Sequence, residues 1–391
     1  MNGSCAPVED RRGQQRAWFA ERVSSGAVLA PMAGYSDAPF RRLAHRFGAA
    51  WAVSEMVSAK ALALQPHDDA CVRVSAPYPG EPRAVVQLFA AEPDLAARAI
   101  ERLERVHRPA AFDLNLGCPV RKVINRGCGS ELLREPRRAA AVLAAMVGAA
   151  SVPVSAKLRL GVDRDVAVEV AQALVEAGAA ALAVHGRTAH QRFDGRADWD
   201  AIARVAAAVD VPVLGSGDVV DAHGYERARA AGLGVMVARG AIGRPWLFAQ
   251  LRGAEAPGRD AIVTVVWRHA RDHTAWYGGP RPLRRLRGHL AAYVAALAAA
   301  PGPRLASEAL RAAVVRVDTL DDLRAALLDH ARVSVDATLE RLDGRWRDLA
   351  TAPLLTLPDE ARQRAPQAFS GPSRTRSPVA GAGPGRPERG R

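Results

Sequence analysis

Lysine is almost absent from this chain of 391 residues, because only Lys60, Lys122 and Lys157 stand among its 54 lysines and arginines. Cysteine is also sparse, with four residues and no CxxC pair. Cys118 and Cys128 lack the companion ligands of a zinc site, so we expect no bound metal. So few cysteines in so long a chain are typical of a reducing compartment in which thiols stay free.

Long apolar runs are missing as well. A membrane-spanning helix needs about 18 or more consecutive apolar residues, and no such run occurs in the sequence. Residues 1–26 carry charges but lack the apolar segment of a secretory signal. We therefore expect a cytoplasmic protein. The hydrophobic content of 49% is enough for a large core, and the length favours two domains or one large barrel with an appendage.

The net charge is +13, which favours a polyanionic partner, most commonly a nucleic acid. Two features reduce the weight of this argument. Arginine has largely replaced lysine, and such a compositional bias raises the charge without implying a function. Residues 361–391 also contribute seven arginines and one glutamate. This segment is rich in Gly, Pro and Ser, and we expect a disordered basic tail there.

Short β-like runs alternate with amphipathic helical segments over residues 28–255. The pattern predicts eight strands, namely Val28–Ala33, Ala50–Met56, Ala84–Ala90, Ala111–Leu116, Val154–Leu160, Ala181–His185, Val213–Ser216 and Gly234–Ala238. The predicted helices between them are Asp37–Phe47, Pro93–His107, Pro136–Val147, Asp165–Ala177, Asp198–Val209 and Ala222–Ala231. Ser58–Pro82 is predicted to be a long loop with helical turns. The fold class is therefore α/β, a TIM (β/α)8 barrel. A doubly wound sheet is the alternative, but no G-x-G-x-x-G follows the first strand.

The strands stop after Pro257. The predicted elements from there on are helices, at Arg259–Tyr277, Pro282–Ala299, Arg304–Val317 and Thr319–Val333, with a short one at Asp336–Leu342 that stops at Gly344. We therefore expect an N-terminal arm (1–27), a catalytic barrel (28–255), a small all-α helical bundle (256–350) and the tail (361–391).

Polar and glycine-rich groups gather at the carboxyl ends of the predicted strands, where a TIM barrel carries its chemistry. The ends of strands seven and eight are glycine-rich and each precedes a helix, a frequent phosphate site, to which Arg239 would add charge-assisted bonds. Two tight turns without a ligand are the alternative.

Lys157 interrupts a largely apolar strand. It suits a Schiff base, a charge that stabilises a reduced flavin or a structural ion pair. Cys118, with an ordinary thiol pKa of about 8.5, would be mostly protonated at neutral pH and could donate a proton. As a nucleophile it would need a base or cation such as His185 or Lys157, and a small buried hydrophobe is the simplest interpretation.

Seven motifs together resemble the tRNA-dihydrouridine synthases, most closely their bacterial B-type branch. They are APMAGYSDAPFR (30–41), QLF (87–89), DLNLGCP with KV (113–119, 122–123), KLRLG (157–161), HGRT (185–188), GD (217–218) and RGAIGRPW (239–246). They occur in the family's order. LRRLRGHL (283–290) resembles the family's RNA-binding helical domain more loosely.

The resemblance implies an oxidoreductase in which NADPH reduces FMN and the flavin passes hydride to C6 of a uridine in tRNA. Cys118 would protonate C5, giving 5,6-dihydrouridine. The implied FMN contacts are Pro31, Met32, Ala33, Gln87, Lys157 and His185, and at the phosphate Ser216, Gly217, Asp218, Ala238 and Arg239. The RNA contacts would be Arg187, Arg284, Arg285 and Arg287. We expect a monomer.

Three positions depart from the family pattern. Ser216 replaces the usual Asn and Ala238 the usual Gly, so we expect weaker or rearranged FMN binding. Glu131 replaces a small residue near Cys118. The main alternative is an FMN barrel that reduces a free pyrimidine or a related small molecule, against which the basic charge and the helical domain argue. A Schiff-base aldolase using Lys157 and a non-catalytic RNA-binding protein are further alternatives.

Overall fold

The computed structural model describes residues 8–65, 69–301, 305–331, 333–341 and 344–355. The predicted basic tail (361–391) lies outside these residues. No helix among them has the length and apolar character that crossing a membrane requires.

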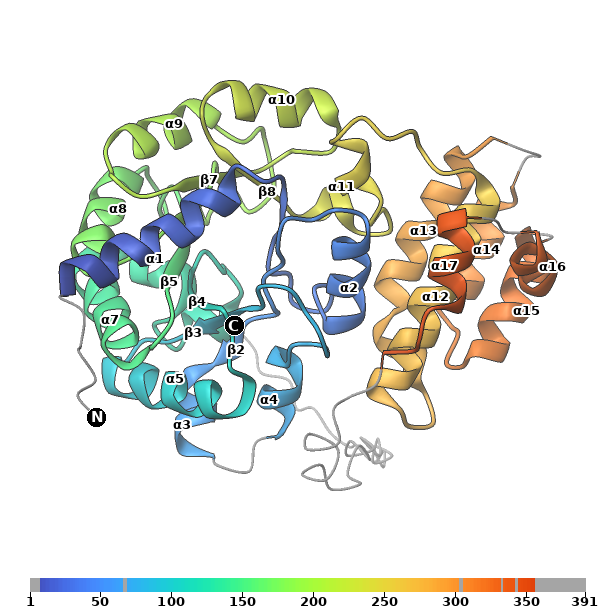
Figure 1. Ribbon diagram of the computed structural model, residues 1–391, viewed down its shortest axis with the longest axis horizontal. Helices are drawn as coiled ribbons and strands as arrows, with labels where there is room; N and C mark the ends of the chain where they lie inside the picture. Colours follow the sequence, from blue (N-terminus) through green and yellow to red (C-terminus); the bar gives the residue numbers. More distant parts are fainter. Residues whose placement is uncertain (1–7, 66–68, 302–304, 332, 342–343, 356–391) are drawn as a thin grey trace, which may run out of the picture.

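Eight parallel strands form a curled sheet in the order β1-β8-β7-β6-β5-β4-β3-β2. An isolated bridge from Leu29 to Ala52, and another from Val53 to Val85, close the ring between the two edges. The strands are β1 (Val28–Leu29), β2 (Val57–Ser58), β3 (Val85–Phe89), β4 (Ala111–Leu116), β5 (Val154–Arg159), β6 (Leu182–His185), β7 (Val213–Ser216) and β8 (Gly234–Val237). The predicted TIM barrel is confirmed (Figure 1).

The first two strands differ from the prediction. The first ends at Leu29, not at Ala33, because Pro31 has no N–H to donate to a neighbouring strand. The second is interrupted, so that only residues 52–53 form bridges before β2 begins. The interruption falls where the Gln87 N–H donates to the side-chain oxygen of Ser54, at 3.1 Å, in place of a backbone carbonyl.

Helices surround the sheet. They are α2 (Ala38–Arg46), α3 (Ala59–Leu64), α4 (Asp69–Ser75), α5 (Pro93–His107), α6 (Arg121–Ile124), α7 (Pro136–Ala149), α8 (Ala167–Glu176), α9 (Trp199–Ala207), α10 (Ala222–Ala230) and α11 (Leu247–Gln250), with 3-10 turns η1 (Gly129–Arg134) and η2 (Arg239–Ala241). Asp37 begins α2 because its side chain accepts the Phe40 N–H at 3.0 Å.

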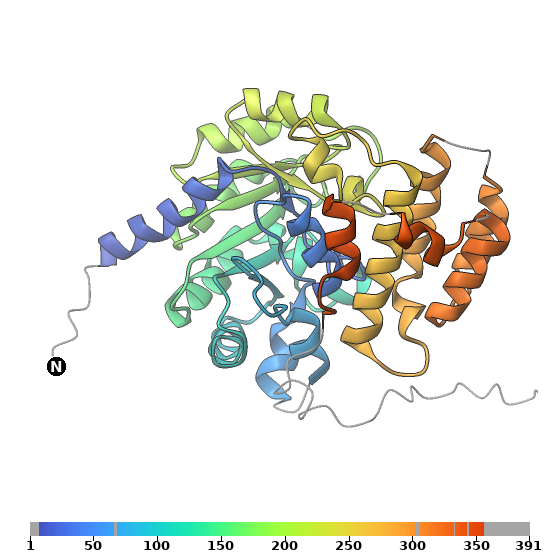
Figure 2. The same ribbon diagram turned by 45° about the vertical axis from the view of Figure 1, so that its right-hand side comes forward.

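The N-terminal arm contains a helix that we did not predict, α1 (Val8–Val23). It crosses the amino-terminal end of the barrel, on the side away from the C-terminal helices (Figures 1 and 2). Phe19 is 2% exposed and joins an apolar cluster with Trp51 and the starts of the strands. Arg16 pairs with Asp210 at 2.6 Å. The helix therefore closes the bottom of the barrel.

The C-terminal unit is helical, as predicted. It consists of α12 (Arg259–Tyr277), η3 (Pro282–Arg285), α13 (Arg287–Ala299), α14 (Ser307–Val314), α15 (Leu320–Ala331), α16 (Val335–Glu340) and α17 (Gly344–Thr351). The predicted helix Pro282–Ala299 is divided into η3 and α13. The predicted short helix Asp336–Leu342 corresponds to α16, whereas α17, which begins at Gly344, was not predicted. One apolar cluster runs from Leu43 of α2 into α12 and α13, which fastens the unit to the side of the barrel.

Candidate active site

A cavity of about 640 Å³ opens at the carboxyl ends of the barrel strands. Its volume lies in the range of about 300–1,000 Å³ that is usual for small-molecule and cofactor sites. Its wall contains Cys118 and all the residues predicted to bind the cofactor, which are Pro31, Met32, Ala33, Gln87, Lys157, His185, Ser216, Gly217, Asp218, Ala238 and Arg239. The structure therefore brings these predicted site residues together in one place.

Cys118 is half-buried and held from both sides by hydrogen bonds. Its N–H donates to Asn115 Oδ1 at 3.0 Å, and its carbonyl accepts the N–H and hydroxyl of Ser130, both at 3.1 Å. Gly129 has φ +64°, and a Cβ there would lie 2.7 Å from the Cys118 carbonyl. Burial raises the pKa of the Cys118 thiol, against the opposing effects of the Val120 N–H and Arg159. The thiol is therefore neutral at physiological pH.

A chain of hydrogen bonds leads from Cys118 into the barrel. Asn115 Nδ2 donates to Gln87 Oε1 at 2.8 Å, and Gln87 Nε2 donates to Asp113 at 2.7 Å. Ser155 donates to the other Asp113 oxygen at 2.6 Å. Because each group has a partner of the correct polarity, the chain fixes the orientation of both amides.

Lys157 and Arg159 enter the cavity from β5. The pKa of Lys157 is lowered to about 8, mainly by burial and also by the charge of Arg159, while Asp113 acts in the opposite direction. Arg159 is itself bonded to the carbonyls of Gly117, Thr188 and Arg192, at 2.9, 2.9 and 2.7 Å. It thus ties the cysteine loop to the loop after β6.

The loop after β6 carries an aromatic residue that we did not predict. Phe193 is 52% exposed and lines the cavity. The Arg239 guanidinium lies 4.3 Å from its ring centre. An aromatic residue in an otherwise polar loop after a strand end is the signal that could have identified it.

Arg187 lies in a different setting from the one expected. It is 1% exposed, and its Nη2 donates to both carboxylate oxygens of Asp218, at 2.7 and 2.9 Å. A buried, ion-paired guanidinium does not present itself to RNA, so the expected direct contact does not fit this position. The neighbouring His185 lines the cavity, and burial together with Lys157 lowers its pKa to about 2.

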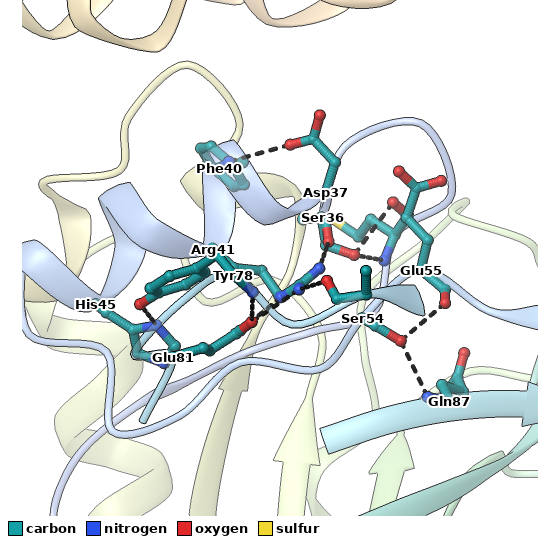
Figure 3. A network of polar contacts seen from close by, with 12 residues as sticks. Ser36, Asp37, Phe40, Arg41, His45, Ser54, Glu55, Tyr78, Glu81 and Gln87 are labelled. Carbon is teal, nitrogen blue, oxygen red and sulfur yellow. Dashed lines mark hydrogen bonds and ion pairs between the residues drawn. The ribbon is translucent and has the colours of Figure 1, made fainter. Parts of the chain in front are cut away.

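The β1–α2 loop, which supplies Met32 to the cavity, is held by a polar network that reaches Gln87 through Ser54 (Figure 3). Ser36 Oγ accepts the Met32 N–H at 2.8 Å, and Glu55 accepts the Gly34 N–H at 2.8 Å. Arg41 donates to the Ser36 carbonyl and pairs with Glu81 at 2.6 Å, both side chains being almost fully buried.

The predicted RNA contacts on the helical unit divide into two kinds. Arg284 and Arg285 are exposed, with Arg285 lying 5.2 Å from the Tyr277 ring centre. Arg287 instead donates to the Val317 carbonyl at 2.9 Å and to Asp318 at 2.6 Å. Further exposed cations, not predicted, stand on the loops after β4 and β6, namely Arg121, Lys122, Arg126, Arg192 and Arg196.

The residues that depart from the family pattern have defined places. Ser216 is buried and Ala238 half-buried in the cavity wall. Glu131 pairs with Arg134 at 3.1 Å, and Arg134 also pairs with Asp163. Glu131 therefore belongs to an ion-pair chain on the rim. The predicted weakening of FMN binding by Ser216 and Ala238 stays a prediction.

The donor set of the cavity fits a flavin with a phosphate group. Lys157, Arg159 and Arg239 bring positive charge to it, against the partly neutralised Asp218. Met32 and Phe193 add apolar and aromatic surface suited to a ring system. Among the described residues, no group of three or more His, Cys, Asp or Glu is arranged to hold a metal ion.

Comparisons with known proteins identify the family of the chain. The sequence model of a family described as dihydrouridine synthase matches residues 28–330. A probable tRNA-dihydrouridine synthase of Rhodobacter capsulatus is 40% identical, covering 74% of this chain and 91% of its own. One of Rhizobium leguminosarum is 38% identical, covering 70% and 86%. The tRNA-dihydrouridine synthase B of Pseudomonas putida is 37% identical, covering 70% and 83%.

Proposed function

The chain belongs to the dihydrouridine synthase family, and we propose that it reduces uridine in tRNA to 5,6-dihydrouridine. One observation carries the proposal. A neutral thiol, Cys118, just after β4, and a half-buried cation, Lys157 of the adjacent strand β5, line the same cavity, and Asn115 and Lys157 are in register. An acid and a cation so placed suit the addition of a hydride and a proton across the C5=C6 bond.

FMN reduced by NADPH would supply the hydride that adds to C6 of the uracil. Lys157 would hold the negative charge of the reduced ring system, and Gln87, fixed by Asp113, would orient it. Pro31, Met32 and Ala33 would line the ring, and His185 its ribityl side. Ser216, Gly217, Asp218, Ala238 and Arg239 would surround the phosphate.

Cys118 would deliver the proton to C5. Its raised pKa keeps the proton on the sulfur until it is needed. The thiolate that remains would lie near the Arg159 guanidinium, which is bonded to the carbonyl of the preceding Gly117. The uracil must leave the RNA stack to reach this depth, at a cost of a few kcal/mol.

Exposed cations support tRNA over a free pyrimidine as the substrate. Arg121, Lys122 and Arg126 follow Cys118 on the rim, and Arg284 stands on the helical unit. Contacts with RNA phosphates would help to offset the unstacking of the base. A free pyrimidine needs no such surface.

Mapping dihydrouridine in tRNA from cells with and without the protein tests the proposal. We expect one or more dihydrouridines to disappear without it, and the purified protein to be yellow and to release FMN on denaturation. Cys118→Ala should still oxidise NADPH through the flavin but fail to reduce tRNA, whereas Cys128→Ala should reduce it. Reduction of free uracil with no activity on tRNA would favour the small-molecule reductase.

A further inference from the structure

The loop between β6 and α9, residues 186–198, forms one wall of the cavity through Phe193. Residues 191–196 are all exposed, so packing alone does not hold this part of the loop. Its position depends on polar contacts with the barrel beneath it.

Arg187, at the buried start of the loop, supplies two of these contacts directly. Nε donates to the Asp194 carbonyl at 3.0 Å, and Nη2 donates to the Gly195 carbonyl at 2.7 Å. The same Nη2 also donates to Asp218, which accepts the Ala197 N–H at 2.8 Å. The loop is therefore fastened at three nearby points to one ion pair.

Backbone strain marks the same place. Asp218 has φ +57° and Arg192 has φ +48°, values that residues other than glycine rarely adopt. Each is held by a buried arginine, Asp218 by Arg187 and the Arg192 carbonyl by Arg159. Strained residues persist when their surroundings determine their conformation, and they cluster at functional sites.

Arg187 also determines the tautomer of His185. Its Nη1 lies 3.3 Å from His185 Nε2. A guanidinium only donates hydrogen bonds, so Nε2 must accept. The neutral imidazole consequently carries its proton on Nδ1.

We propose that Arg187 is a positioning residue, which fixes the Phe193 loop, Asp218 and the Nδ1–H tautomer of His185 and so shapes the phosphate end of the cavity. The identity of the ligand rests on the proposed function, whereas the positioning itself does not. Arg187 therefore acts on the reaction through its neighbours and not through RNA.

Trypsin cleavage tests whether Arg187 holds the loop in place, since Arg192 and Arg196 provide cleavage sites within the loop. In Arg187→Gln we expect the rate of cleavage after these residues to rise at least tenfold. Arg204→Gln is the matched control. Arg204 sits on α9 in an exposed ion pair with Asp165 and does not hold the loop. An unchanged cleavage rate in folded Arg187→Gln would overturn the proposal.

The imidazole nitrogen signals of His185, measured by NMR, provide a readout that a merely structural role would not change. We expect the Nδ1–H form in the parent protein and in Arg204→Gln, and a mixture of tautomers in Arg187→Gln. FMN dissociation from Arg187→Gln should be at least tenfold faster. If the parent protein shows the Nε2–H form, the assignment is wrong.

Asp218→Asn carries the test if Arg187→Gln does not fold. It keeps the shape of the carboxylate but places an amide nitrogen, which cannot accept a hydrogen bond, against Arg187 Nη2 or the Ala197 N–H. We again expect faster cleavage of the loop. An unchanged rate would count against the proposal. Cleavage and tautomer are measured without tRNA. Failure of the tRNA assay would therefore overturn only the proposed function. A normal cleavage rate and a normal His185 tautomer in Arg187→Gln would overturn only this inference.

Discussion

The side chain of Asn115 holds the backbone of Cys118, accepting its N–H at 3.0 Å while donating to Gln87 at 2.8 Å. Asn115→Ala removes both bonds and frees the thiol from its fixed place. Since a shift of about 1 Å lowers a rate about 100-fold, we expect a loss of that size in dihydrouridine formation, with NADPH oxidation little changed. Asn125→Ala, exposed on the same loop, is the control. Full activity of Asn115→Ala would show that the thiol does not depend on this bond.

Lys157 should make the flavin-free protein less stable at neutral pH. Burial lowers its pKa from 10.5 to about 8, so the unfolded chain holds the proton more tightly. The penalty is complete below pH 8 and disappears as the pH rises through 10.5. We expect Lys157→Met to raise the free energy of unfolding at pH 7 by about 1–3 kcal/mol, with the gain shrinking at high pH.

Urea denaturation at pH 7 and pH 9.5 measures this difference, with Lys122→Met, an exposed lysine, as the control. A less stable Lys157→Met protein at pH 7 would mean that attraction to Asp113 outweighs burial. Lys157 would then be the structural ion pair that the sequence left open.

The Arg41–Glu81 pair should be critical for the loop that carries Met32. The two side chains are 2% and 0% exposed, and removing one partner of such a pair costs about 3–5 kcal/mol. Arg41→Met should lower the free energy of unfolding by that amount, and Arg41→Met with Glu81→Leu should recover much of it. Lys60→Ala breaks a pair that is mostly exposed and should change stability by less than about 1 kcal/mol. Equal effects in the two single variants would contradict the importance of burial.

Arg284 and Arg287 should behave differently although both stand in the same basic segment. Arg284 is exposed, so Arg284→Gln should weaken tRNA binding and reduce the slope of log affinity against log salt by about 1. Arg287 is bonded to Val317 and Asp318, so Arg287→Gln should lower stability by about 1–3 kcal/mol. Filter binding at several salt concentrations and thermal melting separate the two effects. A reduced salt slope for Arg287→Gln without a loss of stability would contradict the assignment.

Much of the site could be predicted because its residues stand in the last part of a strand or directly after it. Gln87, Lys157 and His185 each break an apolar run, and the barrel brings all strand ends to one rim. The location therefore follows from the pattern once the fold is recognised. The roles of these residues remain predictions.

The rest depended on contacts between distant parts of the chain. Arg187 looks like any basic residue in a polar motif until Asp218, 31 positions later, is placed beside it. In the same way, Arg287 is recognised as ion-paired only when Asp318 is placed beside it. Helix α1 was missed because its main anchor, Phe19, is a single apolar residue whose partner Trp51 lies beyond β1. A sequence pattern shows which polar side chains the chain carries. It does not show which of them are already bonded to another residue of the same chain.

Helix α1 has a consequence for how the protein is made. Its partners are encoded far downstream, with Arg11 bonded to the Ala150 carbonyl, Arg16 to Asp210, and the Val23 carbonyl to Arg229. The ribosome therefore releases this helix well before Ala150, Asp210 and Arg229 exist to receive it. Trp51, which contacts Phe19, is made sooner, so only part of the surface that covers the helix is available early. Helix α1 can therefore complete its contacts at the amino-terminal end of the barrel only after Arg229 has been synthesised.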